Sequence, residues 1–172
     1  MLDEDRELRR QQAFDVAWRQ LGHRDRTEAE LVQAFLKARV EPALAEQVLG
    51  ELREGGYVDD ARFAQRFAED RRRLDRWGAE RIERRLRELG VARELIAAAL
   101  GADAHDELAA AVELLERRFP EPASTPRERD RQLGMLVRKG YDLELAYDAL
   151  RLRATSSGTT ISPNDRPGLF GS

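Results

Sequence analysis

The sequence predicts an all-α protein built from three tandem three-helix repeats, and three observations support this. Apolar residues recur every three or four positions, as at Ala13, Val16, Ala17 and Leu21, which is the spacing of one helix face. No stretch shows the clean alternation of apolar and polar residues that is typical of a strand. One set of apolar positions also returns at a period of roughly 50 residues.

The repeated set can be followed along the chain. In the first repeat it comprises Leu31, Phe35, Val40, Leu44 and Leu49. The residues 51 positions later are all apolar: Ile82, Leu86, Val91, Leu95 and Leu100. Those a further 50 positions on are Gln132, Leu136, Tyr141, Leu145 and Leu150. Amphipathic segments precede the three sets, at about 11–21, 60–74 and 107–118. Such a period predicts units that stack side by side, each covering the apolar face of its neighbour.

Helix starts and ends punctuate each repeat. Thr27 with Glu30 and Thr125 with Glu128 both have the spacing of a capping box, and Pro126 suits the first helical position. Asp106 suits an N-cap before residues 107–118. Glycine can adopt the left-handed backbone that ends a helix, and it follows helical patterns at Gly55-Gly56, Gly90 and Gly140.

The segment GGYVDDARFA at residues 55–64 is interpreted as the joint between the first two repeats. Asp59 or Asp60 is expected to cap the next helix, Tyr57 to pack into the joint, and Phe63 and Phe67 to be buried. A divalent-cation site is disfavoured because adjacent residues rarely converge on one ion and no third ligand lies nearby in the sequence.

These signals predict four segments. Residues 1–58 comprise an N-terminal extension and repeat 1, 59–104 are repeat 2, and 105–153 are repeat 3. Residues 154–172 are rich in Ser, Thr, Gly and Pro, so we expect a disordered tail, in which Leu169-Phe170 is either a short docking peptide or part of a frayed end.

Composition excludes several classes of function. The chain has no cysteine, so disulfides, thiolate nucleophiles and Cys-ligated zinc are impossible. The first ten residues, MLDEDRELRR, contain no apolar stretch and no long apolar run follows, so we expect neither a secretory signal nor a membrane span, and place the protein in the cytoplasm. No phosphate-binding glycine motif is present. His23 and His105 are single, and four of the five serines lie in the tail. We therefore expect a non-enzymatic protein with no catalytic residues, cofactor or metal.

Charge is distributed unevenly along the chain. The net charge is −3, yet from Arg62 to Arg87 ten arginines face five acids, whereas 27–54 and 100–125 are locally acidic. Either these are ordinary solvated helix faces, or they mark a basic surface for a polyanion or an acidic protein groove. The candidate partner-binding residues are Arg62, Arg66, Arg71, Arg72, Arg73, Arg76, Arg81, Arg84, Arg85 and Arg87.

Trp77 lies between the arginine clusters. A stacking role against a base is possible, but we favour a packing role at a helix joint. The negative net charge argues against a dedicated high-affinity DNA binder, because such affinity depends on neutralising phosphates.

The residues Gly56-Tyr57-Val-Asp59-Asp60-Ala-Arg62-Phe63-Ala64 resemble the signature of the RecX family, regulators of the RecA recombinase. Trp77-Gly78-Ala-Glu-Arg81-Ile82 with Leu89-Gly90-Val91, and Arg138-Lys139-Gly140-Tyr141, resemble two further blocks. The resemblance spans about residues 13–152.

The resemblance implies an elongated, curved helical array that lies in the groove of the RecA–single-stranded DNA filament. It implies inhibition of ATP hydrolysis, coprotease activity and strand exchange, with contact to single-stranded DNA only indirect or weak, and with a role in DNA repair, recombination and the SOS response. We expect a monomer. An independent single-stranded nucleic-acid-binding module and a helical adaptor unrelated to recombination remain alternatives.

Overall fold

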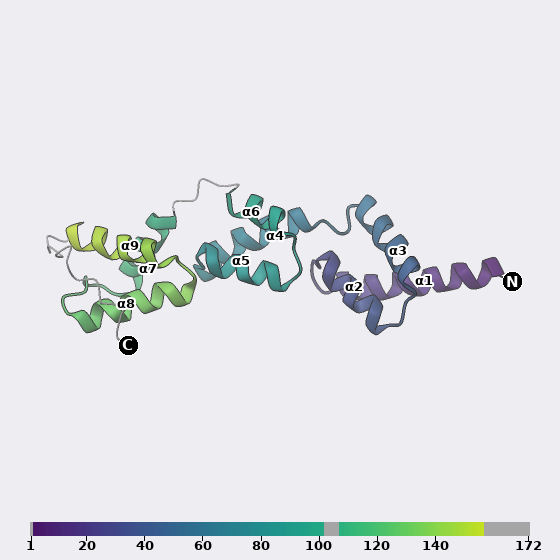
Figure 1. Ribbon diagram of the computed structural model, residues 1–172, viewed down its shortest axis with the longest axis horizontal. Helices are drawn as coiled ribbons and strands as arrows, with labels where there is room; N and C mark the ends of the chain where they lie inside the picture. Colours follow the sequence, from purple (N-terminus) through teal and green to yellow (C-terminus); the bar gives the residue numbers. More distant parts are fainter. Residues whose placement is uncertain (1, 102–106, 157–172) are drawn as a thin grey trace, which may run out of the picture. The chain divides into compact units, whose positions relative to one another are not determined.

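The computed structural model describes residues 2–101 and 107–156, and within these ranges it is helical with no strand (Figure 1). In chain order the elements are α1 Leu2–Leu21, α2 Glu28–Lys37, α3 Pro42–Glu54, α4 Asp60–Asp70, the π-helical segment η1 Arg71–Asp75, α5 Ala79–Glu88, α6 Arg93–Gly101, α7 Glu107–Arg118, α8 Pro126–Lys139 and α9 Leu143–Ser156. The all-α tandem repeat is thereby confirmed. The predicted cap at Asp106 lies outside the described residues.

Two compact units divide the chain. The first comprises Met1–Asp70 and Glu83–Asp103, and the second comprises Arg71–Ile82 and Ala104–Ser172. The division does not follow the predicted repeats, because α5 begins in the second unit and ends in the first. α9 continues to Ser156, three residues into the segment expected to be a tail, and 157–172 lie outside the described residues.

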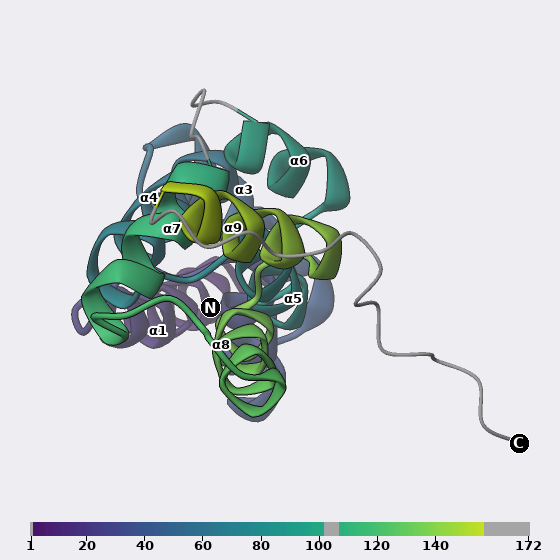
Figure 2. The same cartoon turned by 90° about the vertical axis from the view of Figure 1, so that its left-hand side faces the viewer.

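Each unit has its own apolar core. In the first unit α1, α2 and α3 pack on one another, and α4 packs on α6. The first core comprises Ala13, Ala17, Leu31, Phe35, Val48, Leu49, Leu52 and Val58. In the second unit α9 packs against both α7 and α8 (Figure 2). Its core comprises Ala111, Leu114, Leu115, Leu136, Tyr141, Ala146, Ala149 and Leu150. Every member of the repeated set is buried or half-buried.

Gln132 is the one polar member of that set, and it is 3% exposed. Its amide donates to the Glu121 carbonyl at 3.4 Å and accepts from Arg153 Nη1 at 3.3 Å. Arg153 is 4% exposed and also donates to the Phe119 carbonyl. These bonds satisfy polar groups that would otherwise be costly to bury, which explains why glutamine is tolerated at an apolar position.

Both predicted capping boxes are confirmed. Thr27 and Thr125 accept from the backbone of Glu30 and Glu128, whose carboxylates return to the threonine backbones. One cap was not predicted. The Glu41 carboxylate accepts from Ala43 N and Leu44 N at the start of α3.

One helix-ending turn occurs in all three repeats. The N–H groups of Val40, Val91 and Tyr141 donate to the carbonyls five residues earlier. The preceding residue has a positive φ each time: 58° at Arg39, 80° at Gly90 and 92° at Gly140. The predicted glycine ends at Gly90 and Gly140 are therefore confirmed, while the first repeat makes the turn with arginine.

Each of these glycines faces a helix N-terminus at close range. A Cβ on Gly140 would lie 2.6 Å from Arg81 N, and one on Gly90 would lie 2.3 Å from Ala29 Cβ. Next to Gly140, at the joint between α8 and α5, Gly78 N donates to Lys139 O at 2.9 Å and Glu80 N donates to Gly140 O at 3.1 Å. The end of α8 thus accepts from N–H groups that the start of α5 leaves unpaired. Two helices meet end to end there, and only glycine leaves room.

Candidate partner-binding surface

The ten candidate arginines fall into both units. Arg62 and Arg66 lie on α4, and Arg84, Arg85 and Arg87 on the end of α5, all in the first unit. Arg71, Arg72, Arg73, Arg76 and Arg81 belong to the second unit. The two sets are therefore described one at a time.

In the second unit two of the candidate arginines lie over the ring of Trp77. The Arg81 guanidinium carbon lies 4.2 Å from the centre of the Trp77 ring and that of Arg71 lies 5.4 Å away. Arg71 Nη1 also pairs with Asp75 at 2.5 Å, and Arg81 Nη1 donates to the Arg138 carbonyl at 3.0 Å. The half-buried indole is thus enclosed by two cations. This arrangement supports the packing interpretation of Trp77.

The backbone beside Trp77 departs from regular helix. η1 widens the helix after Asp70, and Arg76 follows with φ 55°. Lys139 Nζ donates to the Asp75 carbonyl at 2.7 Å, and Trp77 N donates to the Arg71 carbonyl at 3.1 Å. Turns of this kind are common at functional sites. The sequence predicted one helix across 60–74 and gave no sign of this change.

In the first unit most candidate arginines contact groups of the same chain. Arg62 Nη2 donates to the Gly56 carbonyl at 2.8 Å, Arg66 pairs with Asp25 at 3.2 Å, and Arg85 pairs with Glu88 at 2.8 Å. Arg87 pairs with Glu83. Arg84 is exposed and has no ion pair or hydrogen bond with another residue of 2–101 or 107–156.

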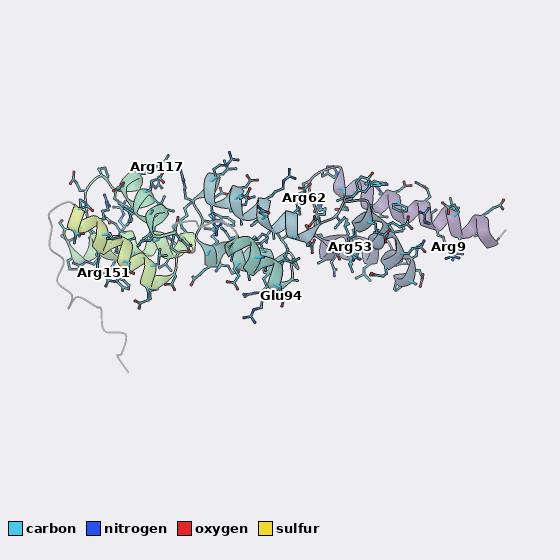
Figure 3. The ribbon with its side chains drawn as sticks, turned by 90° about the horizontal axis from the view of Figure 1, so that it is seen from above. Arg9, Arg53, Arg62, Glu94, Arg117 and Arg151 are labelled. Carbon is cyan, nitrogen blue, oxygen red and sulfur yellow. The ribbon has the colours of Figure 1, made fainter. Side chains whose placement is uncertain are left out.

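These pairs lie on open helix surfaces. Figure 3 shows charged side chains projecting from the helices, Arg62 on α4 and Glu94 on α6 among them. Exposed pairs contribute little to stability, because water and salt compete for both partners. Such arginines can exchange an intramolecular carboxylate for an acidic group of a partner at small cost.

The two adjacent aspartates after Tyr57 each accept a hydrogen bond from the backbone at the start of a helix. Asp59 Oδ1 accepts from Arg62 N at 2.9 Å and so caps α4, as predicted. Asp60 Oδ1 accepts from Glu28 N at 2.9 Å, at the start of α2. Burial raises the pKa of the Asp60 carboxyl, and the nearby charges of Glu28 and Asp59 raise it further, against the lowering effect of the Glu28 N–H bond. Among the described residues no group of three potential metal ligands comes together.

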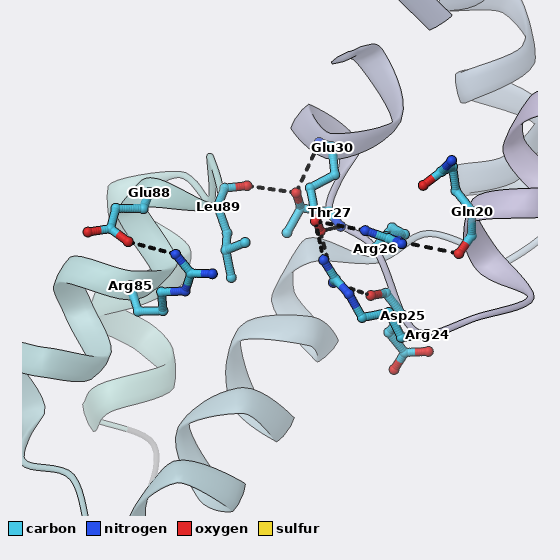
Figure 4. A network of polar contacts seen from close by, with 9 residues as sticks. All are labelled: Gln20, Arg24, Asp25, Arg26, Thr27, Glu30, Arg85, Glu88 and Leu89. Carbon is cyan, nitrogen blue, oxygen red and sulfur yellow. Dashed lines mark hydrogen bonds and ion pairs between the residues drawn. The ribbon is translucent and has the colours of Figure 1, made fainter. Parts of the chain in front are cut away.

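A second hydrogen bond at the start of α2 comes from Thr27, which is fully buried. Figure 4 shows its contacts. Its hydroxyl donates to the Leu89 carbonyl at 2.7 Å while it accepts from Glu30 N at 3.2 Å. Arg24 and Arg26 reach the Glu30 carboxylate. Burial opposes ionisation of Glu30, but these two cations and the Thr27 N–H together lower its pKa. The start of α2 is therefore held by residues from α4 and the end of α5.

One surface feature was missed by the sequence prediction. Trp18 on α1 meets the Tyr57 ring edge-on, with centroids 4.8 Å apart, and Phe14 stacks beside Trp18 at 6.3 Å. Tyr57 is 59% exposed and Trp18 is 40% exposed, so the prediction that Tyr57 packs into the joint was wrong. Phe63 and Phe67 are only half-buried, and the smaller Ala64 and Ala68 fill the core instead. The spacing of Phe14 and Trp18, one helical turn apart, was the available signal.

None of the helices in the described ranges is long and apolar enough to cross a membrane.

Comparison with known proteins gives consistent matches along the chain. The family models described as RecX first, second and third three-helix domain match residues 13–52, 59–100 and 105–150. Regulatory protein RecX of Leptothrix cholodnii is 32% identical over 136 residues, which is 79% of this chain and 85% of that protein. Regulatory protein RecX of Mycolicibacterium vanbaalenii is 35% identical over 151 residues, 83% of this chain and 82% of that protein.

Solved structures agree on the fold. The crystal structure of RecX from Lactobacillus salivarius matches with a TM-score of 0.75 at 15% identity, covering 86% of this chain and 97% of that one. A crystal structure of a regulatory protein RecX matches with a TM-score of 0.67 at 22% identity, over 81% of this chain and 70% of that one. Three consecutive domain matches and relatives above 30% identity lead to one conclusion: the chain belongs to the RecX family.

Proposed function

We propose that this protein is a non-enzymatic regulator of the RecA recombinase, acting in the cytoplasm on RecA filaments assembled on single-stranded DNA. The observation that carries the proposal is the match of all three RecX domains to residues 13–150, together with relatives named regulatory protein RecX. Binding in the filament groove would lower ATP hydrolysis, coprotease activity and strand exchange, and so affect repair, recombination and the SOS response.

The exposed arginines supply a contact chemistry suited to this role. A guanidinium group forks onto carboxylates and phosphates alike, so the same surface fits a filament that offers both. Arg84 and Arg85 are the clearest candidates, because both are exposed on α5 and neither packs on Trp77. Arg81 is a poor choice for a test, since it is bonded to the Arg138 carbonyl and changing it would disturb the fold.

The test is RecA ATPase activity on single-stranded DNA, with and without this protein. We expect inhibition at substoichiometric to near-stoichiometric ratios. Charge reversal by Arg84→Glu with Arg85→Glu is expected to weaken inhibition, because both contacts become repulsive.

Arg151→Glu is the matched control. Arg85 and Arg151 are 50% and 56% exposed, and each pairs with an acid three residues away. Equal inhibition by the double variant and the control would show that the end of α5 is not a contact surface. A wild-type protein that leaves the ATPase unchanged would refute the proposed function itself.

An independent single-stranded nucleic-acid-binding module is the second candidate, favoured by the cations around Trp77. It requires tight binding to naked single strands with a steep dependence on salt. The net charge of −3 opposes it.

A further inference from the structure

The first repeat carries an aromatic cluster in which Trp18 and Tyr57 are exposed and Phe14 is half-buried against the core. Trp18 and Tyr57 meet edge to face at 4.8 Å, and the Arg10 guanidinium carbon lies 5.0 Å from the centre of the Phe14 ring. An open hollow of about 560 Å³ is lined by Asp15, Trp18 and Arg19. Trp and Tyr are among the residues most enriched at binding hot spots, so an exposed Trp18 and Tyr57 in contact with each other need an explanation.

Comparison between repeats shows that the first helix of a repeat can form without rings at the positions of Phe14 and Trp18. The buried residues Ala13 and Ala17 of α1 correspond, 51 positions later, to Ala64 and Ala68, which are buried in α4. In the same register Phe14 corresponds to Gln65 and Trp18 to Glu69. Gln65 and Glu69 are exposed and bonded to each other at 3.1 Å. The first helix of the second repeat therefore carries an exposed polar pair at the positions where the first repeat has two aromatic rings.

The charges around the cluster indicate a protein partner. Arg10 is held by Glu51 and Glu7, Arg62 donates to the Gly56 carbonyl, and Arg19 Nε donates to the Asp15 carbonyl. Five carboxylates accompany these three cations: Glu7 and Glu51 on Arg10, Asp15 beside Phe14, and Glu54 and Asp59 on either side of Tyr57 in the sequence. Residues 27–54 of the same unit are acidic overall. The local excess of carboxylates favours a basic side chain over a phosphate, because a cation is attracted both to the ring faces and to the carboxylates.

We propose that Phe14, Trp18 and Tyr57 form an anchor for a protein surface that places an arginine or lysine side chain on the rings. The inference rests on the proposed function, in which that surface belongs to the protein component of the RecA filament. The acidic, aromatic anchor of the first repeat and the basic residues of α5 would then recognise groups of opposite charge.

The test measures binding of Trp18→Ala and Tyr57→Ala variants to RecA–single-stranded DNA filaments. Leu36→Ala is the control, because Leu36 is an equally exposed apolar residue of the same unit, 57% against 59% for Tyr57. Each aromatic variant is expected to bind at least about tenfold more weakly, as truncation of a hot spot does. Tyr57→Phe keeps the ring and is expected to bind like the wild type.

The fluorescence of Trp18 shows whether a protein or a nucleic acid binds at the aromatic cluster. The chain has two tryptophans, so in a Trp77→Phe variant Trp18 is the only source of indole fluorescence. Its emission is expected to change when filaments are added and to stay unchanged with naked single-stranded DNA. Thermal unfolding of each variant confirms that the fold is kept, and Tyr57→Ala serves if Trp18→Ala unfolds.

The outcomes separate the two proposals. Wild-type inhibition of RecA with unweakened binding by the aromatic variants overturns the anchor and leaves the proposed function standing. A Trp18 signal on naked DNA also overturns it, because the occupant is then a nucleic acid. A wild-type protein that neither binds filaments nor inhibits RecA refutes the proposed function, and the anchor with it.

Discussion

At the residue scale, Thr27 shows how one side chain can both cap a helix and join two repeats. Thr27→Val keeps the shape but removes the hydroxyl, and leaves the Leu89 carbonyl without its 2.7 Å partner. The exposed Thr125 forms the same capping box without a second bond, so Thr125→Val is the control.

We expect Thr125→Val to lower the free energy of unfolding by about 1 kcal/mol, the value of a cap. Thr27→Val should cost about 1–3 kcal/mol more, because a buried acceptor is left unpaired. Urea denaturation measures both, and equal losses would show that the bond to Leu89 contributes nothing.

Asp60 provides a pH-dependent prediction at the same scale. Its pKa is raised in the folded state, chiefly by burial, so the folded protein binds this proton more tightly than the unfolded chain does. The Asp60 contribution to stability is therefore most favourable below the unfolded pKa, near 4, and declines as the pH rises through the raised folded pKa.

The Asp60→Asn variant keeps an oxygen to accept the Glu28 N–H and has no charge to bury. We expect the wild type to lose stability relative to Asp60→Asn as the pH rises from about 4 to 7. Glu28, whose pKa is lowered by its bond to Arg53, is coupled to Asp60 through their charges, so the difference reports the loss of the Asp60 charge together with its effect on Glu28. A difference independent of pH would contradict the assignment.

At the scale of elements, the end-to-end joint between α8 and α5 depends on Gly140. An alanine there would be forced into φ 92° and would place its Cβ 2.6 Å from Arg81 N. We expect Gly140→Ala to lower the free energy of unfolding by more than about 1–2 kcal/mol, the cost of the left-handed backbone alone.

Gly50→Ala is the matched opposite case, because Gly50 lies inside α3 and an added Cβ meets nothing within 4 Å. This change is expected to stabilise the protein by about 1 kcal/mol, since alanine is the better helix former. Thermal unfolding of the two variants should shift in opposite directions, and a shared direction would refute the account of the joint.

At the scale of the whole molecule, the density of charge is expected to matter more for binding than for folding. Charged residues make up 37% of the chain, and most ion pairs of the described residues lie on exposed helix surfaces. At about 1 M salt the Debye length falls to about 3 Å. The melting temperature should then change little, while filament binding weakens strongly. A large fall in melting temperature would mean that the surface pairs hold the fold together.

The sequence by itself determined the helical class, the three repeats, both capping boxes and the glycine ends at Gly90 and Gly140, because these signals act between residues a few positions apart. It also placed the RecX signature. It did not reveal the widened turn before Trp77, since no local signal distinguishes Arg71–Asp75 from ordinary helix.

Only the tertiary structure decided which distant groups meet. Thr27 reaches Leu89, Asp60 reaches Glu28, and Trp18 meets Tyr57 at the surface instead of the joint packing expected for Tyr57. The physical reason is the same in each case: helix periodicity fixes which face a residue lies on, but the packing of one helix against another fixes what that face touches.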